Sequence, residues 1–298
     1  MSKKFAYQGC LVALLVCSGA SGPQRKASSV DGNLAYSHVE KLVGFGPRPP
    51  ASPGIARSQA YITDILKKLN LQVDCQDFLA DTPNGPLSMK NIVGKTRQSD
   101  KPVVILASHY DTRVMTNAVF VGANDGGSST GLLLELARVL SKRQNPFTVW
   151  FVFFDGEEAQ REWSETDSLY GSRYFVEKLK RDGQIQAVKA MVLMDMCGDR
   201  DLKLENDASS TPKLMELVRR SAVELGYAKY LATSQKGMVD DHVPFIRAGI
   251  PAVDLIDFEY GFNLWHTPND TLDKISPHSL KIVGDIVVRT LENLGKRP

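Results

Sequence analysis

Cysteine is scarce in this chain of 298 residues, which contains only four cysteines. Two of them, Cys10 and Cys17, lie in an apolar N-terminal segment, and the other two are Cys75 and Cys197. This sequence has no disulfide framework, and a chain of this length can bury enough apolar surface to fold without one. A small disulfide-stapled scaffold is therefore excluded, and we expect Cys75 and Cys197 to be free, buried thiols.

An excess of basic residues is also absent, because 36 Lys and Arg residues face 34 Asp and Glu residues. The formal net charge is only +2, whereas proteins that bind nucleic acid through its phosphates usually carry a clear basic excess. We therefore expect no nucleic acid as a partner. The sequence also lacks an apolar run of the ~20 residues that a membrane-spanning helix needs, so we expect no transmembrane anchor.

The N-terminus shows the order of features that is typical of an export signal. Lys3 and Lys4 precede the apolar run 10–17, and small residues follow that run. We therefore predict a signal peptide over residues 1–20 and an exported protein, either periplasmic or secreted. A lipid anchor on Cys17 is the alternative interpretation of the same segment.

Continuous apolar runs, rather than alternating ones, are typical of strands that are covered on both faces. Four such runs occur, at residues 103–107, 148–154, 191–194 and 252–256. Apolar residues three and four positions apart predict helices at residues 55–69, 131–140, 169–179, 211–225 and 277–294. This alternation indicates an α/β fold with an open, mostly parallel (mixed) sheet flanked by helices on both faces.

The domain organisation follows from the same pattern. Residues 21–33 are mainly polar and small, which predicts a flexible linker after the signal peptide. Residues 34–298 contain no repeat, no low-complexity tract and no internal linker. We therefore expect them to form a single domain, and we expect the protein to be a monomer.

Acidic and histidine side chains stand at the carboxyl ends of the predicted strands or in the loops near them, where functional residues of such sheets gather. In chain order they are His109, Asp111, Asp125, Glu157, Glu158, Asp195 and His266. Clustered carboxylates repel one another unless a cation or a shared proton offsets their charge. Because histidine and carboxylate side chains are suitable zinc ligands, the pattern predicts a catalytic zinc site.

The adjacent pair Glu157-Glu158 suggests a division of roles, in which Glu158 binds the metal and Glu157 acts as a general acid or base. A pair of glutamates is common on helix surfaces and is weak evidence by itself. This pair is more informative because it follows the buried strand predicted at residues 148–154.

Six segments of the chain resemble motifs of the zinc-dependent glutaminyl cyclases. They are Ser108-His109-Tyr110-Asp111, Phe120-Val121-Gly122-Ala123-Asn124-Asp125, Phe153-Phe154-Asp155-Gly156-Glu157-Glu158-Ala159, Asp167-Ser168-Leu169-Tyr170-Gly171-Ser172-Arg173, Asp240-Asp241-His242-Val243-Pro244-Phe245 and Trp265-His266-Thr267. They occur in order between about Ser52 and the C-terminus. Since the cyclases share a fold with the zinc aminopeptidases, the resemblance implies that fold here.

The resemblance implies one zinc ion per chain, with Asp125, Glu158 and His266 as its ligands. His109 matches a histidine near the metal that the related aminopeptidases use to hold a second zinc ion. Asp195 matches an aminopeptidase ligand of that second ion. A second metal site that includes His109 therefore stays open at this point.

The same resemblance assigns roles around the metal. Glu157 corresponds to the proton shuttle, and Asp195 and Asp241 complete an acidic network around it and the substrate amine. Trp163 and Trp265 match the tryptophans that line the substrate pocket of the cyclases.

The resemblance therefore implies an enzyme, a zinc-dependent glutaminyl-peptide cyclotransferase. Its substrates would be peptides or proteins with an N-terminal glutamine, which it converts to pyroglutamate with release of ammonia. The alternative is a zinc aminopeptidase, because the metal ligands do not separate the two activities. The tryptophans favour the cyclase, since a small aromatic pocket suits the folding of one glutamine side chain onto its own amine. A binding protein without catalysis is disfavoured, because every ligand and the shuttle are present.

Overall fold

The computed structural model describes residue 1 and residues 29–97, 101–260 and 263–296. Apart from Met1, the predicted signal peptide lies outside these residues, as do Cys10 and Cys17. Within the described ranges, no helix is both long enough and apolar enough to cross a membrane. Export and lipid anchoring stay predictions from the sequence.

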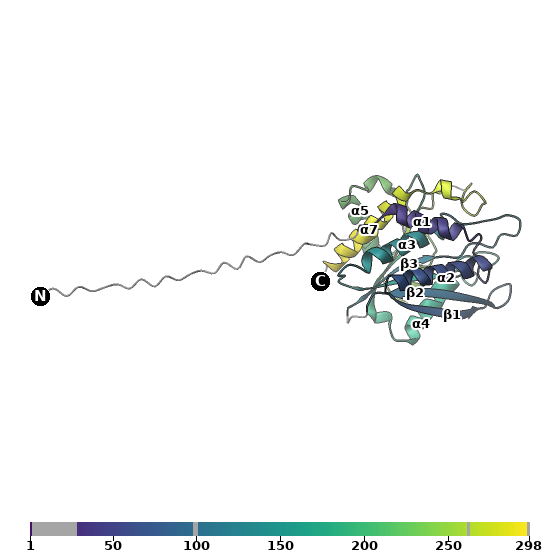
Figure 1. Ribbon diagram of the computed structural model, residues 1–298, viewed down its shortest axis with the longest axis horizontal. Helices are drawn as coiled ribbons and strands as arrows, with labels where there is room; N and C mark the ends of the chain where they lie inside the picture. The colour runs from purple at the N-terminus through teal and green to yellow at the C-terminus, as the bar shows by residue number, and fades with distance from the viewer. Residues whose placement is uncertain (2–28, 98–100, 261–262, 297–298) are drawn as a thin grey trace.

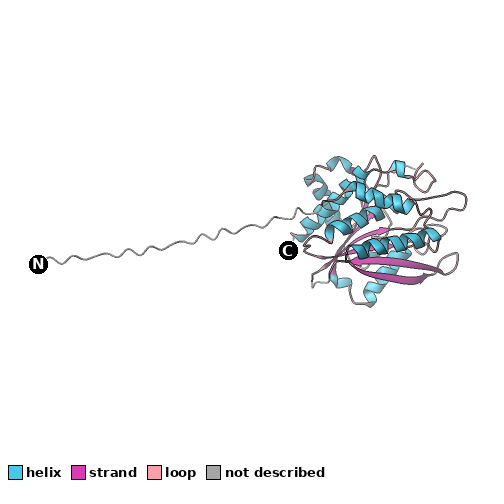
Figure 2. Ribbon diagram, viewed as in Figure 1, coloured by secondary structure: helices cyan, strands magenta, loops and turns pink. Residues whose placement is uncertain are grey.

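A β-sheet lies in the middle of the fold, with helices around it (Figure 2). It has six strands in the order β1-β2-β4-β3-β5-β8. The strands are β1 (Gln72–Ala80), β2 (Leu87–Lys95), β3 (Val103–His109), β4 (Thr148–Phe154), β5 (Val188–Asp195) and β8 (Ala252–Ile256). β4, β3, β5 and β8 run parallel, whereas β1 pairs antiparallel with β2, and β2 pairs antiparallel with β4. The four apolar runs form the four parallel strands, so the prediction of a mostly parallel, mixed sheet is confirmed.

Helices cover both faces of this sheet (Figures 1 and 2). They are α1 (Gly32–Val43), α2 (Pro53–Lys68), α3 (Gly127–Leu140), α4 (Tyr170–Arg181), α5 (Pro212–Glu224), α6 (Val243–Arg247) and α7 (Pro277–Gly295). Helices α1, α2, α3, α5 and α7 contribute to the apolar core on one face, and α4 and α6 contribute to the core on the other. The five predicted helices are confirmed.

Alternate side chains of each parallel strand pack into the two apolar cores on opposite faces of the sheet. In β3, Val104 and Leu106 belong to the first core, whereas Ile105 and Ala107 belong to the second. Successive side chains of a strand point to opposite faces, so a strand buried on both faces must be apolar throughout. This explains why the four parallel strands were recognisable in the sequence.

Several elements were not predicted. α1 begins at Gly32, inside the segment predicted as linker, and the side chain of Asp31 caps it by accepting hydrogen bonds from the backbone N–H groups of Asn33 and Leu34. The outer strands β1 and β2 were also missed, because they mix polar and apolar residues. A short parallel pair, β6 (Leu204–Asp207) and β7 (Leu231–Lys236), lies outside the main sheet.

The two cysteines in the described part of the chain are free, as expected. Cys197 is buried, which confirms the prediction for that residue. The expectation of burial is wrong for Cys75, which is exposed. Cys75 lies on β1, one of the two edge strands of the sheet, where several side chains face solvent.

Candidate active site

The predicted site residues gather at the carboxyl edge of the parallel strands. His109 is the last residue of β3, and Asp195 is the last residue of β5. Glu157 and Glu158 follow the end of β4 closely, and His266 lies in the segment after β8. Parallel strands bring these chain positions to one edge of the sheet, although they are far apart in sequence.

Asp125, Glu158 and His266 form a compact group, with one potential ligand atom from each lying within 4.8 Å of the others. Nε2 of His266 lies 3.0 Å from Oε1 of Glu158 and 3.2 Å from Oδ2 of Asp125. Oδ2 of Asp125 and Oε2 of Glu158 are buried and make no hydrogen bond to the described residues. Buried oxygen atoms without such partners fit a bound cation, and this donor set suits zinc.

The electrostatics of this group also favour a cation. Burial raises the pKa of Glu158 to about 7, and the charge of Asp125 adds to that shift. Burial opposes the charge of His266, but its close contacts with the carboxylates of Asp125 and Glu158 raise its pKa to about 9. The side chains alone would therefore hold protons near neutral pH, and a divalent metal ion displaces such protons when it binds.

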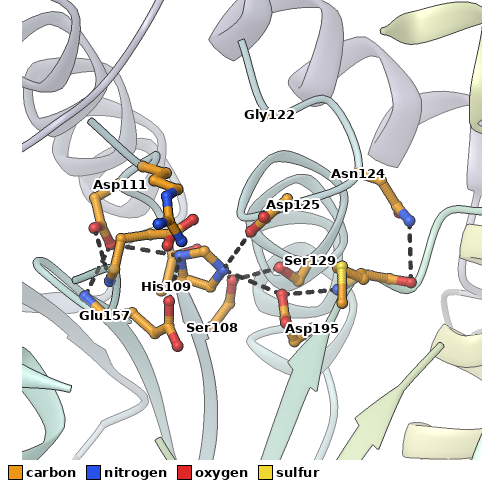
Figure 3. A network of polar contacts seen from close by, with 12 residues as sticks. Ser108, His109, Asp111, Gly122, Asn124, Asp125, Ser129, Glu157 and Asp195 are labelled. Carbon is orange, nitrogen blue, oxygen red and sulfur yellow. Dashed lines mark hydrogen bonds and ion pairs between the residues drawn. The ribbon is translucent and has the colours of Figure 1, made fainter. Parts of the chain in front are cut away.

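A second group shares Asp125 with the first and adds His109 and Asp195. Nε2 of His109 lies 3.1 Å from Oδ1 of Asp195 and 3.3 Å from Oδ1 of Asp125. Figure 3 shows the imidazole ring between these carboxylates and Asp111, whose Oδ1 is 3.4 Å from Nδ1. The three residues of the first group all line a cavity, whereas His109 does not.

The cavity beside the first group has a volume of about 320 Å³. Trp163 and Trp265, both predicted to contact substrate, contribute to its wall. The ring of Trp265 stacks on His266 with the ring centroids 4.1 Å apart, and Trp163 is 42% exposed. The cavity is lined by Arg113, Asp125, Glu157, Glu158, Trp163, Asp195, Met196, Gly237, Met238, Val239, Asp240, Ile256, Phe258, Trp265 and His266.

Glu157 lines this cavity and is only 7% exposed. Burial raises its pKa well above the usual range for a glutamate, and the charges of Asp240, Glu158 and Asp241 add to the shift, while His109 opposes it. A carboxyl group whose pKa is raised binds a proton more readily than a free glutamate, which suits a group that accepts a proton in one step and returns it in the next.

The adjacent residues Asp240 and Asp241 differ in whether they line the cavity. Asp241, the residue assigned to the acidic network from the sequence, is fully buried and does not line the cavity. Asp240 does line it, and burial together with the charge of Asp195 raises the pKa of Asp240 to about 6. Sequence reasoning missed Asp240, because nothing in the sequence says which of two adjacent carboxylates turns towards a cavity.

The sequence profile of peptidase family M28 matches residues 91–291. The chain belongs to peptidase family M28.

Three relatives of this M28 chain bear on its activity. Bovine glutaminyl-peptide cyclotransferase is 32% identical over 266 residues, covering 76% of this chain and 73% of the relative. The crystal structure of an Acidobacteriales bacterium glutaminyl cyclase is 38% identical with a TM-score of 0.88, covering 93% of this chain and 99% of that one. A Zn-dependent exopeptidase from Parabacteroides distasonis is 26% identical with a TM-score of 0.81, covering 91% and 100%.

One further residue shapes the site of this M28 chain without lining the cavity. The carboxylate of Asp111 accepts hydrogen bonds from the backbone N–H groups of Glu157, at 3.1 Å, and Glu158, at 3.3 Å. It therefore fixes the turn that carries both glutamates. The sequence placed Asp111 at a strand end, but it did not indicate this contact with the backbone.

Proposed function

We propose that this chain cyclises the N-terminal glutamine of peptides to pyroglutamate and releases ammonia. The observation that carries the proposal is the position of Glu157, a buried carboxyl group beside a zinc-type ligand group in a cavity with tryptophan walls. The relatives that are glutaminyl cyclases by sequence and by structure support the same activity.

Asp125, Glu158 and His266 are the residues that would hold one zinc ion. Three protein ligands leave a coordination position open to substrate, as catalytic zinc sites do. When bound, zinc supplies Lewis-acid polarisation of the side-chain amide carbonyl of the substrate.

The carboxylates that line the cavity bind the substrate amine and transfer its proton. Asp195 and Asp240 face the cavity and suit the α-amino group of the substrate. Glu157 accepts a proton from that nitrogen as it forms a bond to the side-chain amide carbon. Glu157 returns the proton to the amide nitrogen as the old carbon–nitrogen bond breaks and ammonia leaves. The attack is intramolecular, so the reaction needs neither an enzyme nucleophile nor a water molecule.

The walls of the cavity fit this reaction better than peptide hydrolysis. Trp163 and Trp265 form part of the wall of a cavity of about 320 Å³, and this cavity suits one glutamine side chain folded back onto its own amine. An aminopeptidase would have to admit varied side chains together with an activated water molecule.

A zinc aminopeptidase is the second candidate, and one observation favours it. His109, Asp125 and Asp195 form a second potential metal-binding group that shares Asp125 with the first, as paired metal sites do. In that case Glu157 would act as the base for a water molecule.

Parallel assays of one purified sample test the proposal. The chain is loaded with zinc, its metal content is measured, and it is assayed on a Gln-Ala peptide and on a leucine anilide. We expect ammonia from the first substrate, little turnover of the second, and one zinc ion per chain. Fast anilide cleavage with two tightly bound zinc ions would instead establish the aminopeptidase.

Export and a monomeric state are parts of the same proposal. The paired lysines, the apolar run and the small residues within residues 1–20 support export. Expression of the full chain in a bacterial host, followed by cell fractionation and size-exclusion chromatography, tests both parts. A protein retained in the cytoplasm, or one that elutes as a dimer, would contradict the corresponding part.

A further inference from the structure

The loop that carries Asp125 is held from both sides by buried charged residues. This loop runs from residue 121 to residue 125, between β3 and α3, and Figure 3 shows Gly122 on its path towards Asp125. Gly122 has a φ of +50°, and a Cβ atom there would lie 2.4 Å from the carbonyl oxygen of Asp125. The loop is therefore too tightly folded to accept a side chain at this position.

Arg48 holds the first half of the loop through its carbonyl groups. Its guanidinium donates from Nη1 to the carbonyl oxygen of Val121, at 2.6 Å, and from Nη2 to that of Gly122, at 2.9 Å. Nε donates to the carbonyl oxygen of Tyr110 at the end of β3, at 3.1 Å. One rigid, planar group thus ties the loop to the strand end that also carries His109.

Asp270 holds the second half of the loop through its N–H groups. Its two carboxylate oxygens accept from the backbone nitrogens of Asn124, at 2.8 Å, and Asp125, at 3.0 Å. Its backbone carbonyl accepts from the nitrogen of Ala123 at 3.3 Å. Asp270 lies four residues after His266, so it joins the segments that carry two of the three proposed zinc ligands.

Both residues have no solvent exposure. Burial of a charged side chain is costly unless its hydrogen bonds are made. Each of these two side chains makes two hydrogen bonds to the loop. Neither residue lines the cavity, so neither is placed to touch the substrate. A buried charge with these contacts suits a role in holding the loop that carries Asp125.

We propose that Arg48 and Asp270 are positioning residues that set the zinc affinity of the site by fixing the carboxylate of Asp125. This inference rests on the proposed zinc site, but not on the reaction performed there. Loss of either residue frees the loop, and Asp125 then has to be ordered again whenever the metal binds. Residues that orient metal ligands typically change affinity by 10- to 100-fold when they are replaced.

The test measures zinc binding by the full chain, by competition with a chelator at one fixed pH. In Asp270→Asn, an NH₂ group replaces one of the two oxygens, and it cannot accept the hydrogen bond that this oxygen accepts from a backbone N–H group. In Arg48→Lys, the charge remains but a single ammonium replaces the planar donor group. We expect the zinc dissociation constant to rise at least tenfold in each variant. We also expect the visible absorption of the cobalt-substituted protein to change, because the ligand geometry is less fixed.

Glu135→Gln is the matched control. Glu135 on α3 is also fully buried, and its Oε1 accepts from the backbone nitrogen of Asp31 at 2.7 Å. We expect its replacement to lower the thermal unfolding temperature but to change the zinc dissociation constant less than twofold. In an Asp125→Ala background, Asp270→Asn should add no further loss of zinc affinity, because the proposed effect passes through Asp125.

The possible outcomes are distinct. Unchanged zinc affinity in both variants, or an equal loss in Glu135→Gln, would overturn the inference. Absence of zinc binding by the unaltered chain would instead refute the proposed metal site. If both variants fail to fold, Tyr260→Phe decides the matter, because it removes only the 2.7 Å hydrogen bond from its hydroxyl to Oδ1 of Asp270. A several-fold weaker affinity in that variant supports the inference, and an unchanged affinity refutes it.

Discussion

Replacement of Glu157 by glutamine changes one proton-transfer group and almost nothing else in the cavity. The amide has nearly the same size and shape, but it can neither accept the amine proton nor deliver a proton to ammonia. Glu157 lines the cavity and is 7% exposed, so solvent water has little access to take over this role. The loss should therefore fall on kcat rather than on KM.

The expected magnitude follows from general acid–base catalysis, which contributes about 10²- to 10⁴-fold to a rate. This range corresponds to about 3–5 kcal/mol of activation free energy. Zinc content should stay near that of the unaltered chain, because the proposed ligand is Glu158. Oε2 of Glu157 lies 3.9 Å from Nδ1 of His109, which is not one of the three proposed zinc ligands.

Steady-state kinetics on a Gln-Ala peptide, with zinc measured in the same samples, provide the assay. Asp155→Asn is the matched control, because Asp155 follows the same strand, β4, and is fully buried. Its Oδ2 accepts from the backbone nitrogen of Lys90, at 2.9 Å, and it does not line the cavity. If the glutamine variant kept near-full turnover, or lost its zinc, the roles assigned to Glu157 and Glu158 would be exchanged.

Three other predictions concern the metal, the stability and the substrate. His266→Ala should lose zinc and activity together, as measured by metal analysis and kinetics, because it removes a proposed ligand; full zinc occupancy would contradict its role. Burial raises the pKa of Asp155 to about 8, so the folded protein keeps a proton that the unfolded chain releases above about 4. Denaturant unfolding should therefore show stability falling between about pH 4 and pH 8, with a shallower fall in Asp155→Asn, and parallel curves would exclude this effect. Trp163→Ala should raise KM about tenfold and leave zinc content unchanged. An aromatic contact contributes up to about 1.5 kcal/mol to the binding free energy, which is about tenfold in affinity. An unchanged KM would show that Trp163 does not contact the substrate.

The sequence was most informative where one physical requirement dictates the residues. The four parallel strands must be apolar on both faces, so runs such as 148–154 were recognisable without any structure. The edge strand β1 faces solvent on alternate positions, and its mixed composition gave no comparable pattern. Helix α1 was missed, although its buried residues Ala35, Val39 and Leu42 are spaced four and three positions apart, as in an amphipathic helix.

In the site, too, some residues could be predicted from the sequence and others could not. Strand ends identified His109 and Glu158 because the topology of a parallel sheet gathers such positions. Asp111 and Asp270 act on backbone N–H groups of distant segments, and no sequence pattern records such contacts. Between Asp240 and Asp241, only the local course of the chain determines which side chain lines the cavity.

The mass of the product from a single peptide tests the central claim most directly. The zinc-loaded chain is incubated with a short peptide that begins with glutamine, and the product is analysed by mass spectrometry. We expect a peptide that retains every residue and has lost one ammonia, and Glu157→Gln should form it at least about 100-fold more slowly. A peptide shortened by its N-terminal glutamine, with free glutamine in solution, would contradict the account and identify the chain as an aminopeptidase.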